Sequence, residues 1–244
     1  MRKIIPCAIA AVMATSITTG AVAVSSAFSD VPETHWAYEF VTEAAEKGWV
    51  SGVGGGLFAP DNEVTYADLT TMLVRAFFSE QLEAQTVADD TPWYAAACSA
   101  AEEIGLYVGV DLRTQHTNES MVTQPVSRYE MAQILYNAVR AAGVQLTPDL
   151  SAAQESTADW DSVPGRYQAA VAATKGAGIL AGVDSVGTFN GTATMTRAQA
   201  ATVMSRLDDA LDAGSTIPAL FDGNTSSIRW DSSAVGSAPS DENT

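Results

Sequence analysis

The sequence has few cysteines, histidines and basic residues. Its 244 residues include two Cys, two His and 12 Lys or Arg, against 29 Asp or Glu. Cys7 lies in an N-terminal apolar stretch, so Cys98 has no partner for an internal disulfide and is predicted to be a small buried side chain. His35 and His116 stand in unrelated contexts, which gives no support to a zinc site. The net charge of −17 disfavours nucleic acid as a partner, because phosphate binding needs a basic surface.

Sequence motifs of catalysis are also missing. Residues 54–56 are all glycine, but no Lys-Ser/Thr pair follows them, so they do not form a phosphate-binding loop. The acidic pairs Asp89-Asp90 and Asp159/Asp161 stand at recurring turn positions, where capping and turn formation explain them better than a pair of catalytic carboxylates. We therefore predict that the protein is not an enzyme and has no catalytic residue, no cofactor and no metal site.

The N-terminus has the layout of a secretory signal peptide. Arg2 and Lys3 precede an apolar stretch over residues 4–24, and small residues then allow cleavage after Ala23 or Ala27. An uncleaved membrane anchor is the alternative, although the stretch is barely long enough and contains many hydroxyl groups. The pattern predicts export, with no membrane association once the signal is cleaved.

The remaining sequence contains three copies of one pattern. Each copy has an acidic opening, an aromatic residue, an Ala-rich apolar segment, a glycine pair of the form G-Φ-Φ-x-G-V (Φ apolar or aromatic), a loop and an amphipathic segment. The glycine pairs begin at Gly48, Gly105 and Gly178. Each follows an apolar segment, so these residues are predicted to end helices in the left-handed conformation that glycine adopts easily.

Each amphipathic segment starts with a capping pattern. Thr65, Ser127 and Thr196 are predicted N-caps, and an acid or amide follows three residues later in each case. A lone helix pair of this size buries little core, so three pairs should pack together. We predict an all-α fold of three helix-loop-helix repeats in a pseudo-threefold bundle. The predicted parts are a signal peptide (1–27), copy one (28–83), copy two (84–144), copy three with a preceding linker (145–213) and a flexible, disordered tail (214–244).

The pattern resembles the S-layer homology family, whose repeats run F-x-D-V, W-A, helix, G-I-x-x-G, a loop with F-x-P, then T-R-A-E. Residues 28–78 follow this layout most fully, and residues 88–142 and 159–211 follow it with more drift. The resemblance implies a secreted, non-catalytic module on a bacterial cell wall. It would bind secondary cell-wall polysaccharide, often pyruvylated, in grooves between repeats. The alternatives are direct binding to peptidoglycan and a surface scaffold that binds a protein partner through the tail.

The resemblance also implies ligand-binding residues. Arg128 and Arg197 stand at the Arg position of T-R-A-E, whereas copy one has Tyr66 there. An arginine at a helix start offers a planar donor fork to a carboxylate, and free N–H groups of the helix would add to it. The competing interpretation makes both arginines plain surface residues. The further candidates are the hydroxyl caps, two tryptophans and the second glycine of each pair. Trp36 and Trp93 could instead belong to the core, and Gly52, Gly109 and Gly182 could instead be turn glycines.

Overall fold

The structure, a computed structural model, describes residues 28–110 and 122–215. The predicted signal peptide, part of the long loop of copy two and nearly all of the predicted tail lie outside the described residues. The described elements are helical and include no β-strand, so the predicted all-α class is confirmed. They are α1 (Tyr38–Glu46), α2 (Tyr66–Phe77), α3 (Ser79–Glu83), α4 (Ala95–Glu103), α6 (Arg128–Ala141), α7 (Leu150–Ser156), a 3-10 turn η1 (Trp160–Ser162), α8 (Gly165–Gly176) and α9 (Arg197–Ser215).

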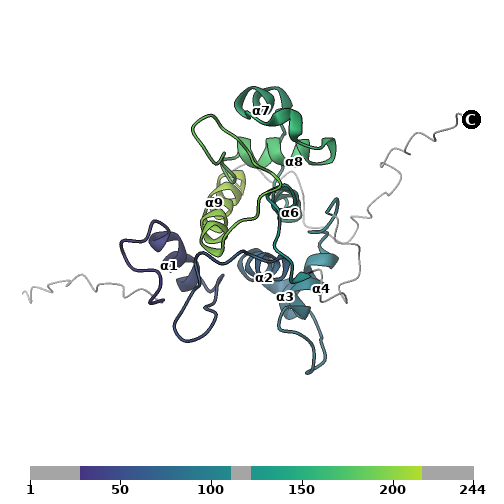
Figure 1. The fold of residues 1–244 in the computed structure, drawn as a ribbon. Helices are drawn as coiled ribbons and strands as arrows, with labels where there is room; N and C mark the ends of the chain where they lie inside the picture. The colour runs from purple at the N-terminus through teal and green to yellow at the C-terminus, as the bar shows by residue number, and fades with distance from the viewer. Residues whose placement is uncertain (1–27, 111–121, 216–244) are drawn as a thin grey trace, which may run out of the picture.

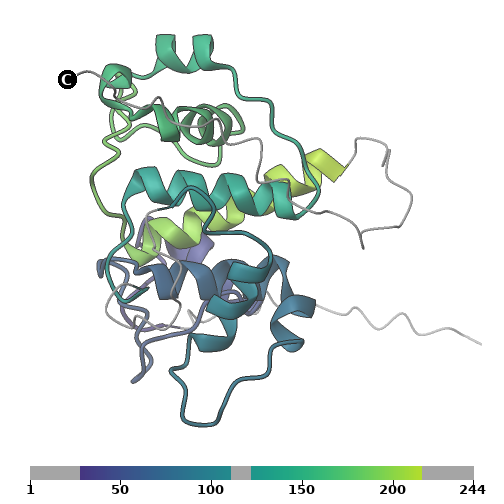
Figure 2. The ribbon, with the colours of Figure 1, turned by 90° about the vertical axis from the view of Figure 1, so that its right-hand side faces the viewer.

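Helices from successive copies pack on one another. Helix α2 packs on α4, α6 packs on α8, and α9 returns to pack on α1. Helix α9 also contacts both α2 and α6, so these helices lie at the centre while α1, α4 and α8 lie outside them (Figure 1). The turned view shows α6 and α9 side by side (Figure 2). The second helix of each copy thus contacts the first helix of the next copy, and the last closes on the first.

The segments that lead into α2, α6 and α9 are joined by backbone hydrogen bonds. The Val64 amide donates to the Met195 carbonyl over 2.8 Å, and the Val126 amide donates to the Val64 carbonyl over 3.0 Å. Isolated antiparallel bridges link the same segments: Glu63 with Thr196, Thr65 with Pro125, and Ser127 with Thr194. The N-termini of the three central helices are therefore held together at one place.

All three predicted capping boxes are present. The Thr65 side chain accepts from the Asp68 amide and the Ser127 side chain from the Glu130 amide, each with the reciprocal bond to the cap amide. In copy three the Thr196 amide donates to Gln199 Oε1 over 3.0 Å, and the Gln199 amide donates back to Thr196 Oγ1 over 3.3 Å. The caps satisfy N–H groups that a first helical turn leaves open.

The helix-ending glycines also behave as predicted. Gly48, Gly105 and Gly178 have φ values of 74°, 78° and 72°. After each of them the next amide reaches back to the helix, as the Trp49 amide does to the Ala44 carbonyl over 2.8 Å. This six-to-one bond is the Schellman motif, which satisfies carbonyls at a helix end.

The segment predicted as a linker before copy three is partly helical. Helix α7 is capped by Asp149, whose side chain accepts from the Ala152 amide, and the helix packs on α8. None of the described helices is long and apolar enough to cross a membrane. The core runs through all three copies, and its largest fully buried side chains are Phe58, Phe189, Leu69, Leu73, Leu106, Met131, Ile134, Leu135, Ile179, Leu180, Met204 and Leu207.

Candidate functional site

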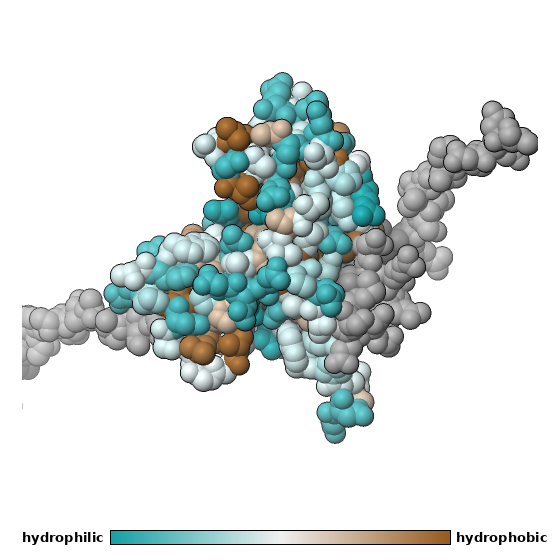
Figure 3. All heavy atoms as spheres, viewed as in Figure 1, coloured by the Kyte–Doolittle hydropathy of each residue, from teal (hydrophilic) through white to brown (hydrophobic). Residues whose placement is uncertain are grey.

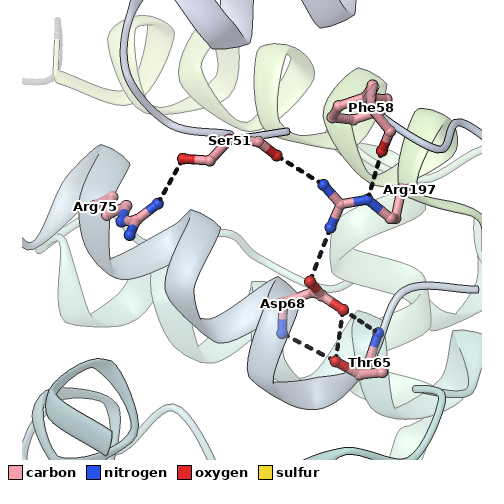
Figure 4. A network of polar contacts seen from close by, with 6 residues as sticks. All are labelled: Ser51, Phe58, Thr65, Asp68, Arg75 and Arg197. Carbon is pink, nitrogen blue, oxygen red and sulfur yellow. Dashed lines mark hydrogen bonds and ion pairs between the residues drawn. The ribbon is translucent and has the colours of Figure 1, made fainter. Parts of the chain in front are cut away.

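Arg197, the first residue of α9, reaches into the loop of copy one (Figure 4). Its Nε donates to the Phe58 carbonyl over 3.0 Å and its Nη2 to the Ser51 carbonyl over 2.9 Å. Nη1 forms an ion pair with Asp68 Oδ1 at 2.8 Å. The guanidinium also lies over the Phe58 ring, 4.8 Å from its centroid. Arg197 therefore joins copy three to copy one through a planar set of contacts.

Arg128, the first residue of α6, makes the matching contacts with the loop of copy three. Its Nε donates to the Phe189 carbonyl and its Nη2 to the Ala181 carbonyl, each over 2.7 Å. The guanidinium lies 4.9 Å from the Phe189 ring centroid. Nη1 meets the Met195 sulfur at 3.6 Å in place of a carboxylate. Arg128 therefore joins copy two to copy three.

Both arginines are buried, with 6% of their surface exposed, so the interpretation as plain surface residues is wrong. Burial lowers the pKa of Arg128, and the negative charge of Asp159 partly offsets that effect. Tyr66, which stands at this position in copy one, is also buried and belongs to the core. The loop of copy two that would face Tyr66 lies partly outside the described residues.

The opening acids of copies one and three hold the same loops from the other side. Asp30 accepts from the Phe58 and Ala59 amides over 2.8 and 2.7 Å. Asp159 accepts from the Phe189 and Asn190 amides over 2.6 and 2.8 Å. The backbones of Phe58 and Phe189 are thus each held by a carboxylate at the N–H group and by an arginine at the C=O group.

These acids also support an uncommon backbone conformation. Ala59 and Asn190 have φ values of 58° and 52°, in the left-handed region that non-glycine residues rarely adopt. Burial would raise the pKa of Asp30, but bonds from the Phe58 and Ala59 amides outweigh it and hold that pKa below its usual value. A local capping or turn role was predicted for Asp159, and its carboxylate instead holds a loop 30 residues later in the chain.

The first N–H groups of the central helices are not free. The Arg128 and Tyr129 amides donate to the Ala193 and Gly191 carbonyls, both over 2.9 Å. The Arg197 amide donates to the Asn62 carbonyl over 2.8 Å. The expectation of free helix N–H groups beside the arginines was therefore wrong, because a neighbouring copy supplies carbonyl partners.

Trp36 and Trp93 lie on the surface, with 59% and 64% of their area exposed. Their interpretation as core aromatics is therefore wrong. Trp36 stacks on His35, with centroids 5.7 Å apart, and Trp93 meets Tyr94 edge-on at 5.4 Å. Both side chains are accessible to a ligand that could stack on them.

The second glycines of the pairs serve the chain's own loops. A Cβ on Gly52 would stand 2.6 Å from the Leu57 carbonyl oxygen, and one on Gly182 would stand 2.8 Å from Gly187 Cα. Gly109 instead has a φ of 78°. At Gly52 and Gly182, the protein's own backbone takes the space that a ligand was expected to approach.

The interface between copies one and two uses neutral groups. The Thr70 and Tyr107 hydroxyls are 2.7 Å apart, and the Tyr107 hydroxyl donates to Cys98 Sγ at 3.6 Å. Cys98 is buried, as predicted. In residues 28–110 and 122–215, no three His, Cys, Asp or Glu side chains are grouped so that they could hold a metal ion.

The arginine-held loops and the capped central helices define a module built from linked helix pairs. Two segments, residues 27–70 and 156–201, match the S-layer homology domain. Both segments therefore belong to that family. They contain the loops held by Arg197 and Arg128, whereas copy two lies outside the matched residues. The prediction of three tandem repeats stays a prediction for copy two.

Curated relatives agree with this family. The chain is 24% identical to an S-layer protein of Bacillus thuringiensis subsp. finitimus over 85% of the chain and 24% of that protein. It is 25% identical to the S-layer protein sap of Bacillus anthracis over 65% of the chain and 19% of that protein. A cell surface protein of Thermoanaerobacter kivui is 33% identical over 36% of the chain and 10% of its own length. The chain thus spans a quarter or less of these relatives.

Proposed function

We propose that the chain is a non-catalytic module that holds a protein on the bacterial cell wall by binding wall polysaccharide between its copies. In this proposal copy two (residues 84–144) is a diverged S-layer homology repeat that completes a set of three. The bound sugar carries an acidic group such as a pyruvate ketal. The supporting observation is that both S-layer homology segments present an arginine-held loop at a junction between copies. The S-layer and cell surface proteins among the relatives make a surface location the natural one.

The geometry suits a glycan better than a large apolar partner. The Nη2 atoms of Arg197 and Arg128 bond to Ser51 and Ala181, which are exposed loop residues. A sugar carboxylate can approach the guanidinium from that edge. The face in Figure 3 has only small, separate hydrophobic patches among hydrophilic surface. A contiguous apolar patch would be expected of a stable protein interface.

A pull-down with cell-wall sacculi tests the proposal. The protein without residues 1–27 should sediment with intact sacculi and lose most of that binding when the secondary polysaccharide is chemically stripped. Binding that survives stripping would instead support direct recognition of peptidoglycan. No sedimentation with either preparation would remove the wall-binding function, and a protein captured only through residues 214–244 would favour the scaffold alternative.

The exposed tryptophans give a second prediction. Replacing Trp36 and Trp93 together with alanine should weaken sacculus binding about thirtyfold, because stacking on each of the two rings is worth roughly 1 kcal/mol. Both side chains are more than half exposed, so the midpoint of thermal unfolding should change little. Trp160, which is buried, gives the matched contrast: its replacement should lower the unfolding midpoint. Undiminished binding by the Trp36/Trp93 variant would remove these residues from the ligand site.

A further inference from the structure

The two arginine sites differ in one contact. Nε and Nη2 donate to carbonyls of the next copy in both sites, and both guanidinium groups stack on a phenylalanine. Nη1 of Arg197 pairs with the Asp68 carboxylate at 2.8 Å. Nη1 of Arg128 has the Met195 thioether, a weak acceptor, at 3.6 Å. The Arg197 charge is therefore paired with a carboxylate, whereas the Arg128 guanidinium has no carboxylate in direct contact.

The sequence explains the difference. Asp68 is the third residue of α2 and the acid of its capping box, and the corresponding residue of α9 is Gln199. Gln199 can still cap Thr196, because an amide oxygen accepts a hydrogen bond as a carboxylate does. It cannot supply charge to Arg128. The substitution keeps the helix start and removes the counter-charge.

No other acid takes the place of Asp68 in direct contact with Arg128. The charge of Asp159 acts on Arg128 from a distance, but the Asp159 oxygens bond to the Phe189 and Asn190 amides and not to the guanidinium. Asp30 bonds the loop of copy one in the same way, so these acids do not distinguish the sites. In the described part of the chain, no carboxylate forms an ion pair with Arg128 within 4.0 Å. Buried charges in proteins are normally paired, so an unpaired guanidinium favours an anionic ligand.

We propose that the Arg128 site, between copies two and three, is the one that takes the carboxylate of the ligand. The carboxylate enters beside Ala181 and replaces the Met195 sulfur as the partner of Nη1. The Arg197 site is a structural clamp whose charge Asp68 already satisfies. This inference rests on the proposed glycan-binding function and makes its two arginine sites unequal.

Substitutions of Gln199 test the assignment. Gln199→Asp gives copy three the carboxylate that Asp68 supplies in copy one, at the position from which it should pair with Arg128. Gln199→Asn is a control of the same size as Asp and without charge. The probe is a methyl hexoside that carries a pyruvate ketal, with its carboxyl methyl ester for comparison, measured by titration calorimetry. The wild type should bind one equivalent of the acid at least tenfold more tightly than the ester. Gln199→Asp should bind the acid at least tenfold more weakly than Gln199→Asn does.

The reciprocal substitution is Asp68→Asn, which frees Arg197 and should raise the stoichiometry toward two. Thermal unfolding of all three variants checks that each is folded at the titration temperature. Equal affinities of the Asp and Asn variants at position 199, or two acid equivalents bound by the wild type, would overturn the assignment. Such a result would leave the proposed function intact if the protein still sediments with sacculi, whereas failure to sediment would count against the proposed function itself.

Discussion

Replacing Arg197 with methionine should lower the free energy of unfolding by about 3 to 5 kcal/mol, the usual cost of removing one member of a buried ion pair. The side chain is 6% exposed and holds copy three against copy one. Its removal leaves the Asp68 carboxylate without its cation and the Phe58 and Ser51 carbonyls without their donor. Urea unfolding followed by circular dichroism measures the loss.

A nearby arginine provides the control. Arg75 on α2 is exposed and donates through Nη1 to Ser51 Oγ over 3.0 Å, beside the Arg197 network (Figure 4). Arg75→Met should cost about 0.5 kcal/mol or less, as surface substitutions usually do. A cost below about 1 kcal/mol for Arg197→Met, or equal costs for both variants, would show that the clamp does not hold the copies together.

This structural role changes how ligand binding should be tested. Alanine at both Arg128 and Arg197 would remove contacts between copies as well as any ligand contact. Lost wall binding by that double variant would therefore not separate unfolding from the loss of a site. Substitutions at Gln199 keep both arginines and their carbonyl partners, and they change the charge only at the position that corresponds to Asp68.

The sequence predicted features that depend on a few neighbouring residues. The caps at Thr65, Ser127 and Thr196 join residues three apart, so their pattern is visible in the sequence. The partners of Arg197 could not be predicted in this way. Its Nε bonds to the carbonyl of Phe58, 139 residues earlier, and a backbone carbonyl leaves no mark of side-chain identity.

The predictions that failed were those that depend on contacts between residues far apart in the sequence. Free helix N–H groups were expected because a helix start alone has none of its first amides paired. The carbonyls of Ala193 and Asn62 come from other copies and satisfy these amides. The Trp36 and Trp93 positions recur, which suggested core, but recurrence alone does not tell a buried aromatic from an exposed one. An Asp in the opening and a Phe in the loop recur in copies one and three, and this recurrence could have predicted a contact between opening and loop. Asp30 accepts from the Phe58 amide, and Asp159 accepts from the Phe189 amide.

Gly191 should tolerate no side chain, although its backbone conformation does not itself require glycine. Its carbonyl accepts the Tyr129 amide over 2.9 Å, and a Cβ at this position would overlap the Tyr129 ring. That ring cannot move away easily. It stacks 5.5 Å from Tyr167 and 5.8 Å from Phe189, and its hydroxyl donates to the Ser162 carbonyl over 3.0 Å.

Gly191→Ala should therefore destabilise the protein by about 3 kcal/mol, the upper part of the range for overpacked sites. Gly176→Ala is the control, because a Cβ at the end of α8 meets nothing within 4 Å. That variant should be neutral or more stable by up to about 1 kcal/mol, since alanine favours a helix over glycine. Urea unfolding compares the two. Equal stabilities would mean that the loop can withdraw from Tyr129, and that the junction between copies two and three is held by Arg128 without close packing of the Tyr129 ring.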